Sequence, residues 1–281
     1  MNSLKTVLLL GLLSGLLLVG GHALGGQRGM TMGLILAVGM NFFSYFFSEK
    51  MALMSSGAVR VSETENQEIY WRIAPTVKSL CERMGLPMPR LWVIPEDAPN
   101  AFATGRNPGH SSVAVTAGLL RLMDDRELEG VIAHELGHIR NRDILVSSIA
   151  ATIGAAITYA AYMAMFFGGR RDDDDAPNPL VGLLMMILAP LAAGLIQMAI
   201  SRTREYGADA AAAKFTGSPR GLISALGKLE SWSRRIPMDV NPSMSHMYII
   251  KPFSGQSMAR LFSTHPATEE RIARLEALGA Q

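Results

Sequence analysis

Four long stretches of the chain are dominated by apolar residues and separate it into alternating hydrophobic and mixed regions. The stretches are Thr6–Ala23, Met30–Phe47, Ile144–Phe167 and Leu180–Ile200. A helix needs roughly 18 or more apolar residues to cross a bilayer, and each stretch approaches or exceeds that length. The pattern therefore predicts four transmembrane helices arranged as two hairpins.

Each hairpin has an alternative interpretation. The first stretch has one lysine, a leucine-rich centre and a Gly-His-Ala ending, which also resemble a cleavable signal peptide. We favour an uncleaved anchor, because a second hydrophobic stretch follows after a short turn at Leu24–Gly29. The second pair of stretches leaves open a hydrophobic hairpin that is only partly immersed in the bilayer.

The mixed region between Lys50 and Asp143 alternates between helical and strand patterns. Ser62 and Glu65 are spaced as a capping box before a helix that ends at Gly85. Its apolar stripe at helical spacing consists of Ile69, Ile73, Val77 and Leu80. Two strands are predicted, at Leu91–Ile94 and Ser112–Thr116, with Asn100–Gly105 as an edge strand or loop between them.

Four more helical segments are predicted. One starts at the acidic run from Asp124 and carries an apolar stripe formed by Leu128, Val131, Ile132, Leu136 and Ile139. Beyond the fourth hydrophobic stretch, residues 201–210 continue as a helix, Pro219–Glu230 forms another, and a last helix begins near Pro266. The fold class is therefore mainly α with a small β-sheet (α+β), plus four transmembrane helices.

Charge and cysteine content limit the location and the partners. Lysine and arginine are concentrated in residues 49–143 and 201–281, so we expect both segments to face the cytoplasm. The formal net charge of +2 and the absence of a basic-aromatic stripe exclude nucleic acid as a partner. Cys81 is the only cysteine, which fits a reducing compartment.

Two histidines flank a glutamate in the sequence His134-Glu135-Leu136-Gly137-His138. On an α-helix, residues four apart lie about 40° apart around the axis, so both imidazoles project from one face. Zinc accepts such ligands and lowers the pKa of a bound water to roughly 7, so Glu135 is placed to act as the general base. Solvated histidines on a polar helix face are the alternative.

A catalytic zinc ion needs a third protein ligand, and Glu205 is the best candidate. It lies just beyond the fourth hydrophobic stretch, and Asp209 follows one helical turn later on the same face. Asp209 is therefore placed to hydrogen-bond the far nitrogen of a ligand histidine. By itself, Glu205 would be interpreted as a surface acid paired with Arg202 or Arg204.

These motifs resemble the HtpX-type membrane metalloendopeptidases, relatives of the CAAX prenyl endopeptidases within the gluzincins. The resemblance covers nearly the whole chain, from the N-terminal hairpin to Ser201-Arg202-x-x-Glu205-x-x-Ala208-Asp209. It implies one Zn²⁺ per chain bound by His134, His138 and Glu205, with Glu135 as general base and Asp209 orienting a histidine. It also implies a gluzincin-like protease domain.

The same resemblance assigns residues around this centre. Asn100 and Ala101 look like the substrate-binding edge segment and are expected to pair with the peptide backbone. His265 and Arg271 look like a late H-P-x-x-x-x-R element that stabilises the oxyanion. Without the resemblance, His265 would be interpreted as a residue at a helix start.

The predicted organisation has four parts: a transmembrane hairpin (1–48), a cytoplasmic part with the sheet and the zinc helix (49–143), a second hairpin (144–200) and a cytoplasmic part with the third ligand (201–281). The expected activity is hydrolysis of internal peptide bonds in misfolded or membrane proteins at the cytoplasmic face of a bacterial inner membrane. The resemblance implies protein quality control, with membrane quality-control proteases as partners. The alternatives are a non-proteolytic scaffold or chaperone with structural zinc, and a prenyl-protein processing peptidase.

Overall fold

The computed structural model describes residues 2–143, 202–235 and 266–279. The chain divides into two compact units, one made of Met1–Phe47 with Leu145–Ile200 and the other of Ser48–Ile144 with Ser201–Gln281. The second unit contains all of the sheet and the helices α2 to α9 described below.

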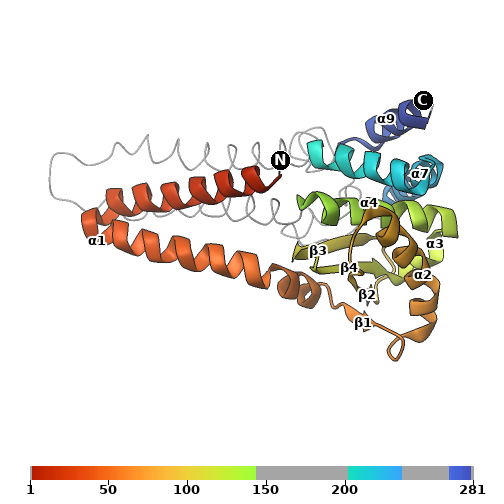
Figure 1. Cartoon of the computed structure of the whole chain (residues 1–281), viewed down its shortest axis with the longest axis horizontal. Helices are drawn as coiled ribbons and strands as arrows, with labels where there is room; N and C mark the ends of the chain where they lie inside the picture. Colours follow the sequence, from red (N-terminus) through yellow and green to blue (C-terminus); the bar gives the residue numbers. More distant parts are fainter. Residues whose placement is uncertain (1, 144–201, 236–265, 280–281) are drawn as a thin grey trace. The chain divides into compact units, whose positions relative to one another are not determined.

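The N-terminal segment forms a helical hairpin. Helix α1 (Asn2–Ser55) is interrupted at Gly25 and Gly26, where non-helical backbone reverses the chain (Figure 1). This break lies inside the predicted turn. The two arms approach closely near it, because a Cβ on Gly21 would lie 2.3 Å from the carbonyl oxygen of Gly29. Glycine permits this approach since it has no side chain.

The first two predicted spans lie on α1. Among the residues that the structure describes, no helix is both long enough and apolar enough to cross a membrane. The second predicted pair of spans, Ile144–Phe167 and Leu180–Ile200, lies outside the described residues.

The second unit is built on a four-stranded mixed sheet with the strand order β1-β2-β4-β3. Its strands are β1 (Val59–Val61), β2 (Arg90–Ile94), β3 (Ala101–Asn107) and β4 (His110–Thr116). Strand β2 pairs with β4 in parallel, whereas the pairs β1·β2 and β3·β4 are antiparallel. Both predicted strands are confirmed, and the ambiguous segment after Asn100 is the edge strand β3.

The helices confirm most of the predicted pattern. They are α2 (Gln67–Met84), α3 (Ala117–Leu122), α4 (Asp125–Asn141), a helix over residues 202–216, α7 (Arg220–Arg235) and α9 (Thr268–Gly279). Helix α2 ends at Gly85, which adopts a left-handed conformation with φ 67° as expected of a C-cap. Strand β1 and helix α3 were not predicted, because three and six residues are too short to show a period.

One predicted helix start was wrong. The Ser62 hydroxyl accepts a hydrogen bond from the Glu65 main-chain nitrogen (3.1 Å), so the two residues do form a local turn. Helix α2 nevertheless begins later, at Gln67, after Asn66 in a left-handed conformation. The pairing of Ser62 with Glu65 closes the loop before the helix, because serine side chains stabilise turns as readily as caps.

Helix α4 lies at the centre of this unit, between the sheet and α7 (Figure 1). Its buried stripe joins one core with residues of α2, β4 and α7. Two glycines allow its neighbours to come close. A Cβ on Gly130 would lie 2.6 Å from the main-chain nitrogen of Leu222, and one on Gly137 would lie 3.1 Å from the Cα of Ala208. The missing side chains of these two glycines therefore allow close backbone packing at both positions of the helix.

Candidate active site

Helix α4 presents the two histidines of the motif on one face. Asp124 caps the helix by accepting a hydrogen bond from the Glu127 main-chain nitrogen (2.9 Å), and the Glu127 carboxylate accepts one from the Asp124 nitrogen (2.9 Å). This capping box fixes where the helix starts. From that start, His134 and His138 lie one turn apart, with Nε2 atoms 3.2 Å from each other.

The helix over residues 202–216 brings Glu205 to the same point. Its Oε2 atom lies 3.5 Å from His134 Nε2, and its Oε1 atom lies 3.5 Å from His138 Nε2. Glu205 is 4% exposed. The close approach of Gly137 to Ala208 explains how the two helices place these donors together, because Ala208 lies one turn beyond Glu205.

These three donors fit a single metal ion. Ligands bound at about 2.0–2.2 Å from one tetrahedral ion lie about 3.3–3.5 Å apart. The two Nε2 atoms are 3.2 Å apart, and each lies 3.5 Å from a different oxygen of the Glu205 carboxylate, so the nearest separations are of this size. One ligand atom from each of the three residues can be chosen so that all lie within 4.8 Å of one another. His134, His138 and Glu205 therefore form a group that can hold a metal ion.

Asp209 and Arg271 support the first histidine. Asp209 Oδ1 lies 2.9 Å from His134 Nδ1, which places the ring proton on Nδ1 and leaves Nε2 as an acceptor facing the metal position. Arg271 donates to both oxygens of Asp209, from Nε at 2.9 Å and from Nη2 at 2.7 Å. The contact of Asp209 with the Nδ1 atom of His134 is the one that was expected of this aspartate. Arg271 is 1% exposed and lies against Asp209.

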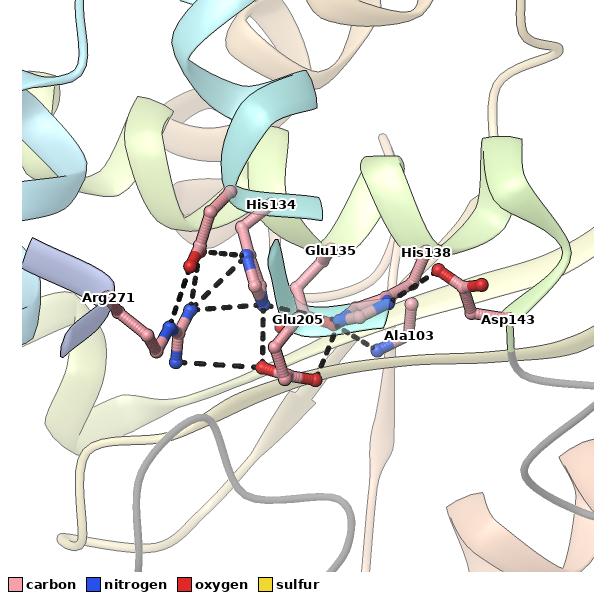
Figure 2. A network of polar contacts seen from close by, with 8 residues as sticks. Ala103, His134, Glu135, His138, Asp143, Glu205 and Arg271 are labelled. Atoms are coloured by element: carbon pink, nitrogen blue, oxygen red, sulfur yellow. Dashed lines mark hydrogen bonds and ion pairs between the residues drawn. The ribbon is translucent and has the colours of Figure 1, made fainter. Parts of the chain in front are cut away.

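Asp143 takes the equivalent place beside the second histidine. Its Oδ2 atom lies 3.1 Å from His138 Nδ1, and the residue is 3% exposed. Figure 2 shows Arg271 and Asp143 on opposite sides of the pair of histidines. Asp143 was not predicted from the sequence, because a residue five positions after His138 lies roughly 140° away from it on a continuous helix.

The charges in this cluster favour a cation. Burial by itself opposes protonation of His134, but the hydrogen bonds to Asp209 and Glu205 outweigh it and raise the pKa of His134 to about 9. Acceptor atoms of three side chains that converge at 3.2–3.5 Å repel one another unless a proton or a metal ion lies between them. Metal binding here therefore displaces a proton.

Glu135 lies beside the metal position and faces strand β3. Its Oε2 atom accepts a hydrogen bond from the main-chain nitrogen of Ala103 (2.8 Å), as the dashed line in Figure 2 shows. The residue is 4% exposed. Burial raises the pKa of Glu135 above its ordinary value, although His134 and His138 act in the opposite direction. A carboxylate with a raised pKa is suited to accept and return a proton.

Strand β3 carries the predicted substrate edge. The carbonyl oxygen of Asn100 accepts from the Thr116 nitrogen (2.9 Å), and the Asn100 nitrogen donates to the Thr116 hydroxyl (2.9 Å). Both main-chain groups of Asn100 are therefore occupied by residues of the protein. The Ala103 N–H points away from β4, and Ala101, two residues earlier, shares that direction. His265 lies outside the described residues.

The fold and this donor group define a metallopeptidase, and comparisons with known proteins agree. Residues 70–278 match the model of peptidase family M48. The chain is 53% identical over 279 residues to the protease HtpX homolog of Desulfatibacillum aliphaticivorans, covering 98% of this chain and 89% of the relative. It is 50% identical over 277 residues to that of Paraburkholderia phytofirmans, covering 98% and 96%.

A solved structure shows the same fold. The crystal structure of S. mikatae Ste24p superposes with a TM-score of 0.57 at 22% identity and covers 98% of this chain. The chain spans 65% of the length of that structure. The chain belongs to peptidase family M48. It is a membrane-associated metalloprotease of the HtpX type, and its substrates are polypeptides.

Proposed function

We propose that this chain is a zinc-dependent endopeptidase that cleaves internal peptide bonds of misfolded or membrane proteins at the cytoplasmic face of the bacterial inner membrane. The observation that carries the proposal is the triangle of His134, His138 and Glu205 donors beside the buried Glu135. Two imidazoles and one carboxylate are the donor set of catalytic zinc sites that keep a position open for substrate or water.

Glu135 is the general base in this proposal. A bound zinc ion would polarise the scissile carbonyl and acidify the attacking water. Glu135 takes the proton of that water and later delivers it to the leaving amine. Asp209 holds the His134 ring so that Nε2 faces the metal position. The buried Arg271 holds Asp209 and also pairs with Glu205, whose Oε2 lies 3.6 Å from Arg271 Nη1. A direct contact of His265 or Arg271 with the oxyanion stays a prediction.

We propose that the substrate peptide extends along β3, the edge of the sheet formed by the described residues. An exposed edge holds a peptide by main-chain hydrogen bonds. Thr116 occupies the main chain of Asn100, so the expected pairing is left to Ala101 and to the carbonyl group of Ala103. The Ala103 N–H is donated to Glu135, which places the substrate strand beside the general base.

Digestion of an unfolded soluble protein such as casein tests the mechanism, using the full-length protein in detergent with zinc restored after chelation. Glu135→Gln is expected to bind one zinc ion per chain but to cleave about 10²–10⁴-fold more slowly, because it cannot accept the proton. Glu129→Gln on the same helix is the matched control, since Glu129 pairs only with the surface residue Arg83 in the described structure. Normal cleavage by Glu135→Gln would disprove the mechanism. Faster cleavage of a prenylated peptide than of casein would favour prenyl-protein processing.

We propose that residues 1–48 and 144–200 attach the enzyme to the membrane, with residues 49–143 and 201–281 in the cytoplasm. The support is an apolar surface on α1, whose exposed large side chains within residues 1–48 include Val19, Met32, Leu34, Ile35, Leu36, Val38, Phe42, Phe43, Phe46 and Phe47. The protein should stay in the membrane pellet after alkaline carbonate extraction. A protease added from outside should remove a C-terminal tag in inside-out vesicles but not in intact spheroplasts. The reverse pattern would contradict this orientation.

A further inference from the structure

Asp143 is buried at the end of the zinc helix, and its carboxylate contacts a predicted metal ligand. Oδ2 lies 3.1 Å from His138 Nδ1, and only 4% of the side chain is exposed. The His138 side chain is 15% exposed. A buried carboxylate is unfavourable unless it is hydrogen-bonded or paired, so its place beside the imidazole is a specific feature of this end of the helix.

The backbone is shaped to bring Asp143 to that place. Helix α4 ends at Asn141, and Arg142 adopts the left-handed conformation with φ 57° and ψ 34°. Its N–H bonds back to the carbonyl oxygens of His138 and Ile139. The left-handed conformation is unfavourable for a residue with a side chain. It changes the chain direction here, and the next residue, Asp143, then returns to the His138 ring.

The contact determines which nitrogen of His138 is available to a metal. A carboxylate beside Nδ1 accepts a hydrogen bond from an N–H at that position, so Nε2 carries the lone pair that faces His134 and Glu205. Asp209 has the same relation to His134, with Oδ1 at 2.9 Å from Nδ1. Each histidine of the centre thus has its own buried carboxylate, and the two carboxylates come from different segments of the chain.

We propose that Asp143 is a positioning residue that holds His138 as the Nδ1–H tautomer and thereby sets the affinity of the centre for its metal. This role rests on the metal centre proposed above and extends it to a residue outside the ligand set. Partners of this kind typically change metal affinity 10–100-fold. Because Asp143 contacts no reacting atom, its main effect is on retention of the metal.

Competition with a chromophoric zinc chelator tests the proposal on the full-length protein in detergent. Asp143→Ala is expected to weaken Zn²⁺ binding about 10–100-fold. Asp143→Asn keeps the shape of the side chain and one acceptor oxygen, so a smaller loss of zinc affinity is expected. If the alanine variant does not fold, the asparagine variant provides the test. Asp125→Ala is the matched control, because Asp125 is an exposed residue in the first turn of the same helix. The control should bind Zn²⁺ as the parent protein does.

Two further measurements separate positioning from a merely structural role. In Asp143→Ala, the unfolding midpoint should fall more with zinc than with EDTA, and the visible spectrum of the Co²⁺-loaded protein should change. Wild-type zinc affinity in both Asp143 variants would overturn the proposal, as would equal losses of midpoint with zinc and with EDTA. Failure of the unsubstituted protein to bind Zn²⁺ would instead refute the metal centre itself.

Discussion

Arg271 and Asp209 show how single residues stabilise the candidate centre. Arg271 is 1% exposed and donates two hydrogen bonds to the Asp209 carboxylate. Burial opposes ionisation of Asp209, but the charge of Arg271 outweighs it, so the pKa of Asp209 is held below its ordinary value. Asp209 therefore stays ionised at neutral pH, and it accepts the hydrogen bond that orients His134.

Removing Arg271 should destabilise the fold and the metal site together. Arg271→Met leaves Asp209 as a buried carboxylate without its paired guanidinium, for which a loss of about 3–5 kcal/mol in unfolding free energy is expected. Chemical denaturation checks this value. Arg274→Met is the matched control on the same helix, because Arg274 is 56% exposed and its ion pair with Glu270 contributes about 0–1 kcal/mol. Similar losses of unfolding free energy in the two variants would contradict a special role for the buried pair of Arg271 and Asp209.

At the scale of elements, the position of α4 depends on its first turn. Glu127 belongs to the capping box and also accepts hydrogen bonds from the Lys228 ammonium (2.6 Å) and the Ser224 hydroxyl (2.6 Å) of α7. It therefore connects the start of α4 to α7. Burial raises the pKa of Glu127, but the bonds from Lys228, Ser224 and the Asp124 nitrogen outweigh it, and the net pKa is lowered.

Because the pKa of Glu127 is lowered in the folded state, the contribution of this residue to stability should decrease as the pH falls. A carboxyl group with a lower pKa in the folded state contributes stability above its unfolded pKa of about 4.3, and this contribution is lost as the pH falls through the folded value. Glu127→Gln should lower the unfolding free energy at pH 7 by about 1–2 kcal/mol. The difference in stability between this variant and the parent protein should shrink below pH 4, which unfolding midpoints measured between pH 7 and pH 3 would show. A difference that does not change with pH would contradict a stabilising role of the ionised Glu127.

Close packing of α4 against the helix over residues 202–216 makes Gly137 a sensitive position. A Cβ there would lie 3.1 Å from the Cα of Ala208, so Gly137→Val forces apart the two helices that carry the ligands. We expect a loss of about 1–3 kcal/mol in stability and zinc affinity at least roughly tenfold lower, since the donors separate.

Gly227→Ala is the control for helix propensity. Gly227 lies within α7, and a Cβ there would meet nothing within 4 Å. Replacing a helical glycine by alanine at such a position should stabilise the protein by about 0.4–1 kcal/mol. Thermal unfolding and chelator competition measure both variants. Zinc binding by Gly137→Val at the affinity of Gly227→Ala would rule out the proposed spacing requirement.

At the scale of the whole molecule, the candidate metal site connects two distant parts of the chain. His134 and His138 come from α4, whereas Glu205 follows residues 144–200 in the sequence. A ligand that binds only the folded state stabilises it, by about 4 kcal/mol when its free concentration is 1,000 times the Kd.

Chelation should therefore lower the unfolding midpoint without unfolding the protein at room temperature. The core formed by α2, α4, α7 and the sheet contains none of the three candidate ligands, so the helical circular dichroism signal should be unchanged. Zinc should restore both the midpoint and casein cleavage, whereas Mg²⁺ should restore neither, because magnesium prefers oxygen ligands. Loss of the helical signal on chelation would contradict an independent core.

Most elements around the site could be predicted from sequence because their signals are local. The acidic start at Asp124, the helical stripe that follows it and the strand patterns of β2 and β4 each lie within one short segment. The prediction at Ser62 was wrong, since the same residues also stabilise a turn. The break of α1 at Gly25 and Gly26 fell inside the expected turn, where two glycines adjoin.

The sequence by itself determined the chemistry of the centre. Two imidazoles on one helix face, a glutamate between them and a glutamate-aspartate pair on a later helix are residue types and spacings that need no tertiary model. Only the tertiary structure decided what surrounds them: Asp143 against His138, Ala103 against Glu135, and Thr116 on the main chain of Asn100. These contacts depend on a left-handed turn, a strand register and the approach of separate segments, and none of these is encoded in local spacing.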